Sequence, residues 1–533
     1  MARETEALLL RDTQKDLFFN PQLAVETQYD LIYIKNQVIL GWPLGAQRLF
    51  AELARENTVI IIGVALGDEG KGRLVDNKIK FLLEIPGVQK VVVIRFQGGS
   101  NAGHTIQIRG ENVGLHQVPS GIMYAETVGI MDRGMVIHPE DLITEIGYIE
   151  DKVGDTRGKL ILSSDAILVT DLERAEEVLN TIKQKKAAGG TGRGIGPAYA
   201  HFYDRLGLNI HDLMDENWRE TLGTQYDRYE KEFTAFGLDL PNVLVPDFKE
   251  TKRSGKSKTR TVGQREEFLD RLEDARKKLI EKDLVKNTFV SHTNIYSDLS
   301  YGVLFEGAQA LGLHAWLGTR PDVTSSDTSM DGIKTGTAVW RGQDILDRIG
   351  VFKIPYTSSV GVRKMPTHIE LPKDLADLPE TATDEQKRAA YIRVKAREKG
   401  TTSGRFRDIL HLDLEMIRYN CRMAGIEVLA GTHLDIAREG ETIKVCTHYT
   451  NGSGERVPYQ PGLRYLNGVI PHYIELPGWD GEAVAKAKSI EELPDNARYF
   501  LAFIQGTTGY PIVAVTTGPA RENFISVPDR EIK

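Results

Sequence analysis

A short glycine-rich segment carries the clearest chemical pattern in this chain. Residues 67–72 read GDEGKG and follow the β-branched run Val59–Ile62. A buried strand, a glycine-rich turn and a helix from about Arg73 would aim backbone N–H groups and a positive helix end at an anion. Glycines allow the backbone to approach a ligand closely, and Lys71 adds a positive charge. The segment therefore predicts a phosphate-binding loop.

This loop differs from the Walker A pattern, G-x-x-x-x-G-K-[ST]. Ala65 occupies the position of the first glycine, and Gly72 replaces the hydroxyl residue that normally binds magnesium. Asp68, inside the loop, is the oxygen ligand that remains for a metal ion. An ordinary tight turn between a strand and a helix is the alternative interpretation, so the loop needs support from other segments.

The composition narrows the class of protein. A chain of 533 residues with 41% hydrophobic and 27% charged residues fits a soluble globular protein with several domains or one large α/β domain. Its net charge of −8 gives no general attraction to nucleic acid or to an anionic membrane. No apolar run approaches the ~18 residues of a membrane span. Two cysteines and no targeting pattern predict a cytoplasmic protein without a disulfide scaffold.

A second glycine-rich loop follows another expected buried strand, Val91–Phe96. It reads QGGSNAGHT over residues 97–105 and presents Asn101 and His104 among small residues. A single histidine after a strand is more often structural than catalytic. Because open α/β sheets bind ligands at the carboxyl ends of their strands, this histidine would lie near the phosphate-binding loop.

A third glycine-rich stretch reads GGTGRGIGP over residues 189–197, and Arg205 follows it. Its glycines argue against a regular element, and its threonine, arginine and bare amides suit an anion-binding nest. A flexible linker is the alternative. Residues 249–260 are basic and poor in apolar side chains, which predicts an exposed loop before a helix at about 264–281.

The later segments offer further polar groups after expected strands. Residues 303–328 present Glu306, Gln309, Thr324 and Ser325 for hydrogen bonding. Residues 400–407 form a hydroxyl-rich segment with two arginines spaced to bind a carboxylate, or else a solvated surface loop.

Two late strands lead to groups that suit recognition of a base. The strand within 428–436 leads to Asp435, whose carboxylate can accept hydrogen bonds from guanine N1–H and the 2-amino group. The strand within 512–519 ends in a Thr-Thr-Gly-Pro turn.

Nine segments, in this order, resemble the adenylosuccinate synthetase family. They are GDEGKG (67–72), QGGSNAGHT (97–105), LHQVPSGI (115–122), TGRGIGPAY (191–199), FEGAQ (305–309), VTSS (323–326), TTSGRFR (401–407), HLD (433–435) and TTGP (516–519). The resemblance implies an α/β fold with a large, mostly parallel central sheet flanked by helices, related to P-loop nucleotide hydrolases. Residues 56–533 would form the catalytic domain, with a basic loop insertion at about 249–260. Residues 1–55 would be an N-terminal extension of unknown role.

The resemblance also implies an activity, the first committed step of AMP synthesis. The family joins IMP and L-aspartate at the expense of GTP through a 6-phosphoryl-IMP intermediate, with Mg²⁺ as the metal. Asp68 would take the N1 proton of the purine and bind Mg²⁺ together with the Gly103 carbonyl. His104 would stabilise the phosphoryl group in transfer.

The family's binding residues carry over one by one. The GTP contacts match Gly67, Glu69, Gly70, Lys71, Gly72, Thr105, Arg407, His433, Asp435, Thr516 and Gly518. The IMP contacts match Asn101, Thr191, Arg205, Gln309, Thr324 and Arg405. The aspartate contacts match Thr402, Ser403, Arg405 and Arg407. Arg205 matches an arginine that reaches the neighbouring subunit's IMP, which implies a homodimer. No nucleic acid or membrane partner is expected.

The sequence departs from the family pattern at a few positions. Leu66 replaces a tryptophan, Ser100 a histidine and His433 a lysine, and the carboxylate loop lacks its usual crowd of arginines. These changes leave two alternatives open. One is a ligase for another 6-oxopurine nucleotide, such as dGMP, with ATP in place of GTP; retention of Asp68 favours IMP. The other is a nucleotide-binding regulator without catalysis, against which Asp68, Lys71, His104 and the loop arginines argue.

Overall fold

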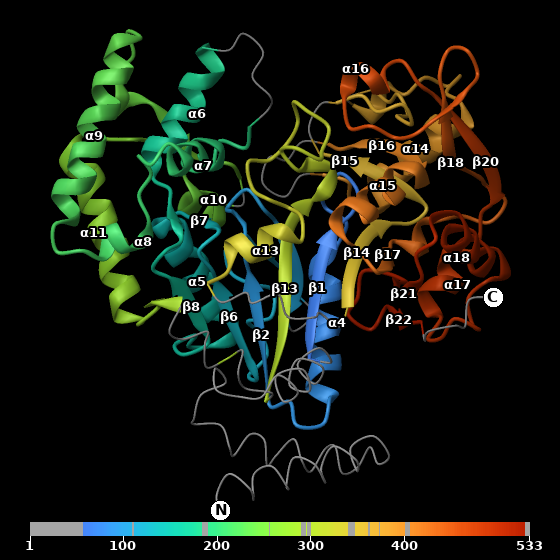
Figure 1. The fold of residues 1–533 in the computed structure, drawn as a ribbon, viewed down its shortest axis with the longest axis horizontal. Helices are drawn as coiled ribbons and strands as arrows, with labels where there is room; N and C mark the ends of the chain where they lie inside the picture. The colour runs from blue at the N-terminus through green and yellow to red at the C-terminus, as the bar shows by residue number, and fades with distance from the viewer. Residues whose placement is uncertain are drawn as a thin grey trace, which may run out of the picture.

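The fold is organised around a ten-stranded sheet (Figure 1). We describe a computed structural model over residues 57–108, 111–183, 190–254, 256–288, 295, 300–338, 347–360, 363–372, 374–399 and 406–527; side chains at 105–112 are excluded. The predicted N-terminal extension, residues 1–55, lies outside these ranges, so its role stays a prediction.

Nine of the ten strands run parallel, which confirms the predicted fold class. Only the last pair is antiparallel. In spatial order the strands are β12 (Val285–Lys286), β8 (Leu160–Ser163), β6 (Thr127–Met131), β2 (Lys90–Arg95), β13 (Tyr301–Ala310), β1 (Thr58–Gly63), β14 (Asp347–Lys353), β17 (Val428–Thr432), β21 (Ile512–Thr516) and β22 (Phe524–Ser526).

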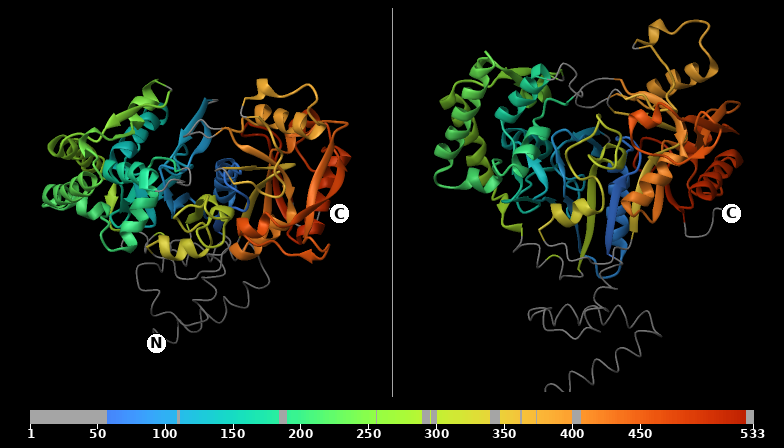
Figure 2. Two further views of the ribbon diagram at one scale, coloured as in Figure 1. Left: turned by 90° about the horizontal axis from the view of Figure 1, so that it is seen from above. Right: turned by 45° about the horizontal axis from the view of Figure 1, so that its top comes forward.

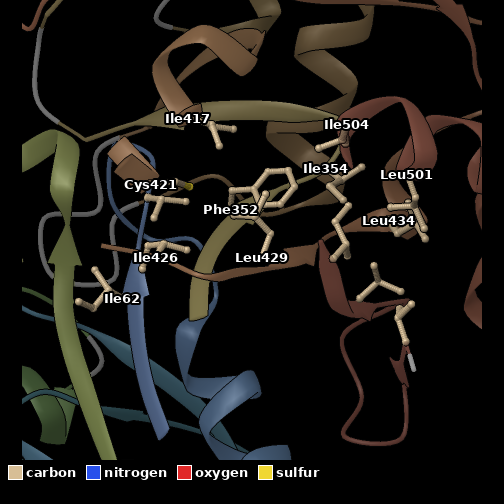
Figure 3. Packing of buried hydrophobic residues seen from close by; sticks show 14 of the residues in the cluster. Ile62, Phe352, Ile354, Ile417, Cys421, Ile426, Leu429, Leu434, Leu501 and Ile504 are labelled. Atoms are coloured by element: carbon tan, nitrogen blue, oxygen red, sulfur yellow. The ribbon is translucent and has the colours of Figure 1, made fainter. Parts of the chain in front are cut away.

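The central strands are apolar because both faces of the sheet are covered. In β1, Ile60 and Ile62 belong to one core cluster, and Val59 and Ile61 belong to another. Alternate residues of a strand point to opposite faces, so these two clusters lie on opposite sides of the sheet. Figure 3 shows Ile62 in the first cluster, together with residues of β14, β17 and the helix at Leu414–Ala424.

The helices divide into two groups at opposite ends of the sheet (Figures 1 and 2). The group beside β8 is α5 (Pro139–Val153), α6 (Asp171–Lys183), α7 (Ile195–Tyr203), α8 (Ile210–Met214), α9 (Trp218–Ala235), α10 (Phe248–Ser254) and α11 (Arg265–Glu281). The group beside β21 is α14 (Asp384–Lys395), α15 (Leu414–Ala424), α16 (Leu463–Leu466), α17 (Gly481–Lys486) and α18 (Asp495–Thr508). Helix α4 (Lys71–Glu84) packs on the central strands, and α13 (Asp331–Gly336) lies before β14. Helices α5, α6, α8, α9 and α11 share one buried apolar cluster, and α15, α17 and α18 contribute to another.

Smaller strands complete the fold. A second sheet contains β15 (Tyr356–Ser359), β16 (Asp408–Asp413), β18 (Thr442–Thr450), β19 (Arg456–Val457) and β20 (Ile470–Pro477). Three short sheets contain β3 (Gly98–Gly99), β7 (Met135–Ile137) and β9 (Ile167–Leu168); β4 (His104–Ile108) and β5 (Glu111–Leu115); and β10 (Leu244–Pro246) and β11 (Thr259–Thr261). Both cysteines, Cys421 and Cys446, are buried free thiols. No helix in the described ranges is long and apolar enough to cross a membrane.

Two local expectations were wrong. The basic segment 249–260 is not simply a loop: α10 continues to Ser254, and β11 pairs with β10. Its side chains are mostly exposed, but Lys252 lies over the Tyr148 ring, 5.0 Å from the centroid, and Arg260 pairs with Asp171 at 2.8 Å. The third glycine-rich stretch is not wholly irregular either, because α7 begins at Ile195.

Candidate active site

The predicted phosphate-binding loop lies between β1 and α4, at the carboxyl end of the strand. Gly67, Asp68 and Gly70 all have positive φ angles, of 97°, 58° and 84°. Gly70 caps α4 in the left-handed conformation without a side-chain hydrogen bond to the helix. The first amides of a 14-residue helix are therefore available to an anion. A Cβ on Gly67 would lie 3.0 Å from Leu313, so glycine is needed there for space as well as conformation.

A buried carboxylate holds this loop in shape. Glu69 is fully buried; its Oε1 accepts from the Gly67 amide at 2.7 Å and its Oε2 from Lys71 Nζ at 2.8 Å. Lys71 Nζ also donates to the Gln309 carbonyl at 2.5 Å. The Glu69 side chain is thus turned into the protein. The predicted contact between Glu69 and GTP could involve only its backbone.

The loop opens into a cleft of about 1400 Å³ that most of the predicted site residues line. These residues are Gly67, Asp68, Gly70, Lys71, Gly72, Asn101, Gly103, His104, Thr191, Gln309, Thr324, Arg407, His433, Asp435 and Thr516. They come from segments more than 400 residues apart in the chain, which supports the sequence interpretation of a single ligand-binding site.

Other predicted residues lie elsewhere. Glu69, Gly518 and Arg205 do not line the cleft. Gly518 is adjacent, since its carbonyl accepts from Arg73 Nη1 at 2.8 Å, whereas Arg205 is exposed. Thr402, Ser403 and Arg405 lie outside the described residues. Thr105 belongs to β4, but its side chain is not described.

His104 is oriented by a carboxylate from the neighbouring part of the sheet. Its Nδ1 lies 2.7 Å from Oε1 of Glu306, which is fully buried in the middle of β13. Oε2 of Glu306 accepts from the Ser120 amide at 2.9 Å. Burial, with Arg95 and Lys71 nearby, lowers the pKa of His104 although Glu306 opposes this shift. The imidazole is therefore neutral at pH 7 in the ligand-free protein, with its Nδ1 proton directed at Glu306.

Asp68 projects from the phosphate-binding loop into the cleft and contacts Arg407. The Asp68 side chain is 33% exposed, and its Oδ2 pairs with Arg407 Nη1. Burial lowers the pKa of Arg407 to about 10, so the guanidinium still carries its charge at pH 7. The Nε atom of Arg407 is buried without a hydrogen-bond partner in the described part of the chain.

The end of the cleft that the sequence predicts to read the base, called the base-reading end below, contains His433 and Asp435 after β17. The His433 amide donates to Thr516 Oγ1 at 3.1 Å, which ties this end to β21. Burial, followed by the charges of Lys353, Arg73 and Arg407, holds the pKa of His433 well below its usual value. The His433 ring is consequently neutral and presents a flat surface. Burial raises the pKa of Asp435, and the Arg73 charge partly opposes the shift.

The third glycine-rich stretch holds an internal anion. The amides of Gly192 and Gly194 donate to the two carboxylate oxygens of Glu177, at 3.0 and 2.8 Å. These two amides thus bind a carboxylate, as the predicted nest would require. Glu177 and Thr191 both line the cleft. Across it, Gln309 has a buried Nε2 without a partner among the described residues, and its Oε1 accepts from Ser326 at 3.3 Å.

The donors around the phosphate-binding loop fit a magnesium ion held jointly with substrate. No group of three or more histidine, cysteine or acidic residues with metal-ligand geometry occurs in the described ranges. Mg²⁺ is commonly bound through one or two carboxylates, with phosphate oxygens and water completing the shell. The Asp68 carboxylate and the Gly103 carbonyl both lie at the cleft, and together they suit that kind of site.

The sequence interpretation missed several residues at this cleft. Lys353, Glu398, Arg73, Arg363 and Glu177 line it but were not among the predicted site residues. None of them lies within a glycine-rich segment, and Arg73, Lys353 and Arg363 each have a partner that is distant in sequence. Arg73 alone had a local signal, because it directly follows the phosphate-binding loop.

Fold and site together define an α/β nucleotide-binding enzyme with a phosphate-binding loop at the carboxyl edge of its sheet. A sequence model described as adenylosuccinate synthetase matches residues 60–525. Adenylosuccinate synthetases from Clostridium botulinum (strain Eklund 17B / Type B) and Geobacter sp. (strain M21) are 34% and 35% identical to this chain over 476 residues. Each match covers 88% of this chain, and 98% and 97% of the relatives. The structure of fully ligated adenylosuccinate synthetase from Plasmodium falciparum aligns with a TM-score of 0.74 and 27% identity, over 88% of this chain and 100% of that one. The chain belongs to the adenylosuccinate synthetase family, which is a family of ligases.

Proposed function

We propose that this protein ligates IMP and L-aspartate to adenylosuccinate and uses GTP as the phosphoryl donor. Family membership and the convergence of the predicted segments on one cleft support this proposal. The observation that carries it is the position of Asp68, inside a phosphate-binding loop and in contact with Arg407, the arginine expected to bind aspartate. A simple nucleotide switch needs a phosphate-binding loop but not this pairing.

The reaction requires the purine oxygen first to act as a nucleophile and then to leave. Asp68 accepts the N1 proton of IMP, which places negative charge on O6. O6 attacks the γ-phosphorus of GTP, the bond to the bridging oxygen breaks, and GDP leaves. The aspartate amine then attacks C6, loses a proton, and expels O6 as inorganic phosphate. The products are adenylosuccinate, GDP and phosphate.

His104 and the loop cations stabilise the charge on the phosphoryl group during transfer. His104 is neutral before substrates bind, and the negative charge of a bound triphosphate raises the pKa of a nearby imidazole. The second proton would sit on Nε2, because Nδ1 is already directed at Glu306. Lys71 and the first amides of α4 would hold the other phosphate oxygens. Mg²⁺, held by Asp68 and the Gly103 carbonyl, would neutralise charge on the phosphates.

A homodimer is part of the proposal. Arg205 is exposed, with a φ of 64°, and its neighbours Phe202, Tyr203 and Leu206 are also exposed, at 46%, 77% and 51%. An arginine surrounded by apolar side chains is suited to an interface. The family resemblance gives this arginine a role in holding the partner's IMP.

The test is phosphate release with GTP, IMP and aspartate, and with each substrate omitted in turn. We expect release to require all three. Asp68→Asn keeps the shape of the side chain but removes its basicity, so kcat should fall by about 10²- to 10⁴-fold. Asp347→Asn is the matched control, because Asp347 pairs with Lys78 outside the cleft.

Three outcomes would contradict the proposal. Release without aspartate would indicate a nucleotide hydrolase or switch. Turnover with dGMP and ATP but not with IMP and GTP would indicate the other purine ligase. Near-normal activity of Asp68→Asn would exclude Asp68 as the base.

A further inference from the structure

Glu398 is a buried carboxylate that connects side chains from three segments at the wall of the cleft. Its Oε1 accepts from Lys353 Nζ at 2.5 Å and from the Tyr356 hydroxyl, and its Oε2 lies 3.3 Å from Arg407 Nη1. Lys353 ends β14, and Tyr356 begins β15. Glu398, Lys353 and Arg407 are 1%, 4% and 7% exposed, so solvent screens these interactions little.

Glu398 holds Arg407 at two points. The Arg407 amide donates to the Glu398 carbonyl at 3.0 Å, and Lys399 and Phe406 form an antiparallel bridge beside this bond. The carboxylate of the same residue contacts the guanidinium. Both the backbone and the side chain of Arg407 are therefore fixed relative to Glu398, and through Lys353 they are fixed relative to the central sheet.

The charges at this wall are balanced. Lys353 and Arg407 carry two positive charges, and Glu398 and Asp68 carry two negative charges. Arg407 contacts both carboxylates. When a substrate carboxylate draws Arg407 away from Asp68, Glu398 still pairs with the guanidinium. Without Glu398, Asp68 would be the remaining carboxylate that neutralises Arg407. Moving Arg407 away from Asp68 would then leave a buried cation unpaired, which is costly.

We propose, on the basis of the function argued above, that Glu398 is the positioning residue for aspartate binding. It holds Arg407 so that the guanidinium can move its charge from Asp68 to the substrate carboxylate, which frees Asp68 to act as the base. Tyr356 fixes the other side of Glu398, and its ring meets His433 edge-on at 5.9 Å between centroids. The same carboxylate is thus linked to the base-reading end of the cleft.

The test compares Glu398→Gln with wild-type protein in steady-state kinetics with each substrate varied. Loss of a charge-assisted contact to Arg407 should raise the KM for aspartate about 10- to 100-fold. The KM values for IMP and GTP should stay within about threefold. Glu398→Asp, which keeps the charge on a shorter side chain, should recover part of the loss. Glu415→Gln is the matched control, because Glu415 is similarly buried but pairs with Arg418 away from the cleft.

A role in stability alone would give a different result. Equal changes in all three KM values, or a lower melting temperature with unchanged kinetics, would overturn the proposal. If Glu398→Gln fails to fold, Tyr356→Phe is measured instead: it keeps all four charges and removes one hydrogen bond to Glu398. It should raise the aspartate KM about threefold and leave the other two unchanged; no change would overturn the proposal. A wild-type protein without aspartate-dependent phosphate release would overturn both proposals, whereas an active wild type with an unaffected Glu398→Gln would overturn only this one.

Discussion

The hydrogen bond between Glu306 and His104 allows a detailed prediction for Glu306→Gln. In the wild type, Oε1 faces His104 Nδ1 at 2.7 Å and also accepts from the Ser120 hydroxyl, which can rotate, whereas Oε2 accepts from the Ser120 amide at 2.9 Å. The Ser120 amide can only donate, so a glutamine must turn its carbonyl oxygen toward Ser120. Its NH₂ group then faces Nδ1 of His104, which must become an acceptor. The substitution therefore destabilises the doubly protonated form of the His104 imidazole.

The size of the effect follows from the lost contact. A hydrogen bond to a charged group contributes about 1.5–3 kcal/mol. At about 1.36 kcal/mol per tenfold change in rate, kcat at pH 7 should fall about 10- to 150-fold. The same free energy corresponds to about 1–2 pKa units. Because the Glu306 charge raises the pKa of His104, its removal lowers that pKa. The decline of kcat at high pH should then begin at a lower pH.

The assay is kcat for aspartate-dependent phosphate release between pH 5.5 and 9, with all substrates saturating. Thermal unfolding of the same samples checks that the variant is folded. Glu415→Gln serves again as a control outside the cleft. An unchanged kcat and pH profile in folded Glu306→Gln would refute the argument that Glu306 supports a positively charged His104. A uniform loss without a shift of the pH profile would also refute it.

Three further predictions concern other parts of the molecule. Arg407→Leu should raise the KM for aspartate about 10- to 100-fold in steady-state kinetics, and an equal rise in the IMP KM would reject the carboxylate assignment. Burial lowers the pKa of His116 to about 3, so the unfolded chain binds a proton below pH 6.5 that the folded chain does not. The free energy of unfolding should therefore decrease by about 2 kcal/mol as the pH is lowered from 6.5 to 5. Denaturant unfolding of His116→Gln should lack this component, and the same pH dependence in the variant and the wild type would contradict the argument. Arg205→Glu should shift the protein toward monomer in light scattering, or raise the IMP KM if the dimer persists. If the variant shows no change in either measurement, the proposed interface is rejected.

The sequence predicted β1, β2, β13, β17 and β21 because their signal is local, but β14, which lies beside β1, was not predicted. β1 and β2 are short β-branched runs, and β13 begins with the apolar residues 303–305. Burial on both faces leaves little choice of side chain in these segments. Helix α11 was predicted to within one residue, since its apolar residues recur with helical spacing. The start of α7 was missed because glycines and a proline mask it, although proline is favoured in the first turn of a helix.

The polar partners at the site could not be predicted in this way. Lys353 and Glu398 are 45 residues apart, and Asp68 and Arg407 lie on segments that only the folded sheet brings together. No spacing rule links such pairs. Glu69 was predicted to contact GTP because it matches a GTP-binding position of the family, but its side chain is turned inward, where Gly63 leaves room for the carboxylate. A backbone position was predictable there, and a side-chain direction was not.

Internal carboxylates neutralise several of the cations at this cleft. Glu69 neutralises Lys71, Glu398 neutralises Lys353 and shares Arg407 with Asp68, and the Glu177 carboxylate binds the glycine amides. The free energy of binding therefore reflects only the difference between the ligand's contacts with these cations and the carboxylate contacts that the ligand replaces. A singly charged anion gains little from that exchange at Lys71. A triphosphate, which also reaches the amides of α4, gains more, because those amides have no side-chain cap to displace. Internal carboxylates thus favour polyvalent substrates over simple anions at this site.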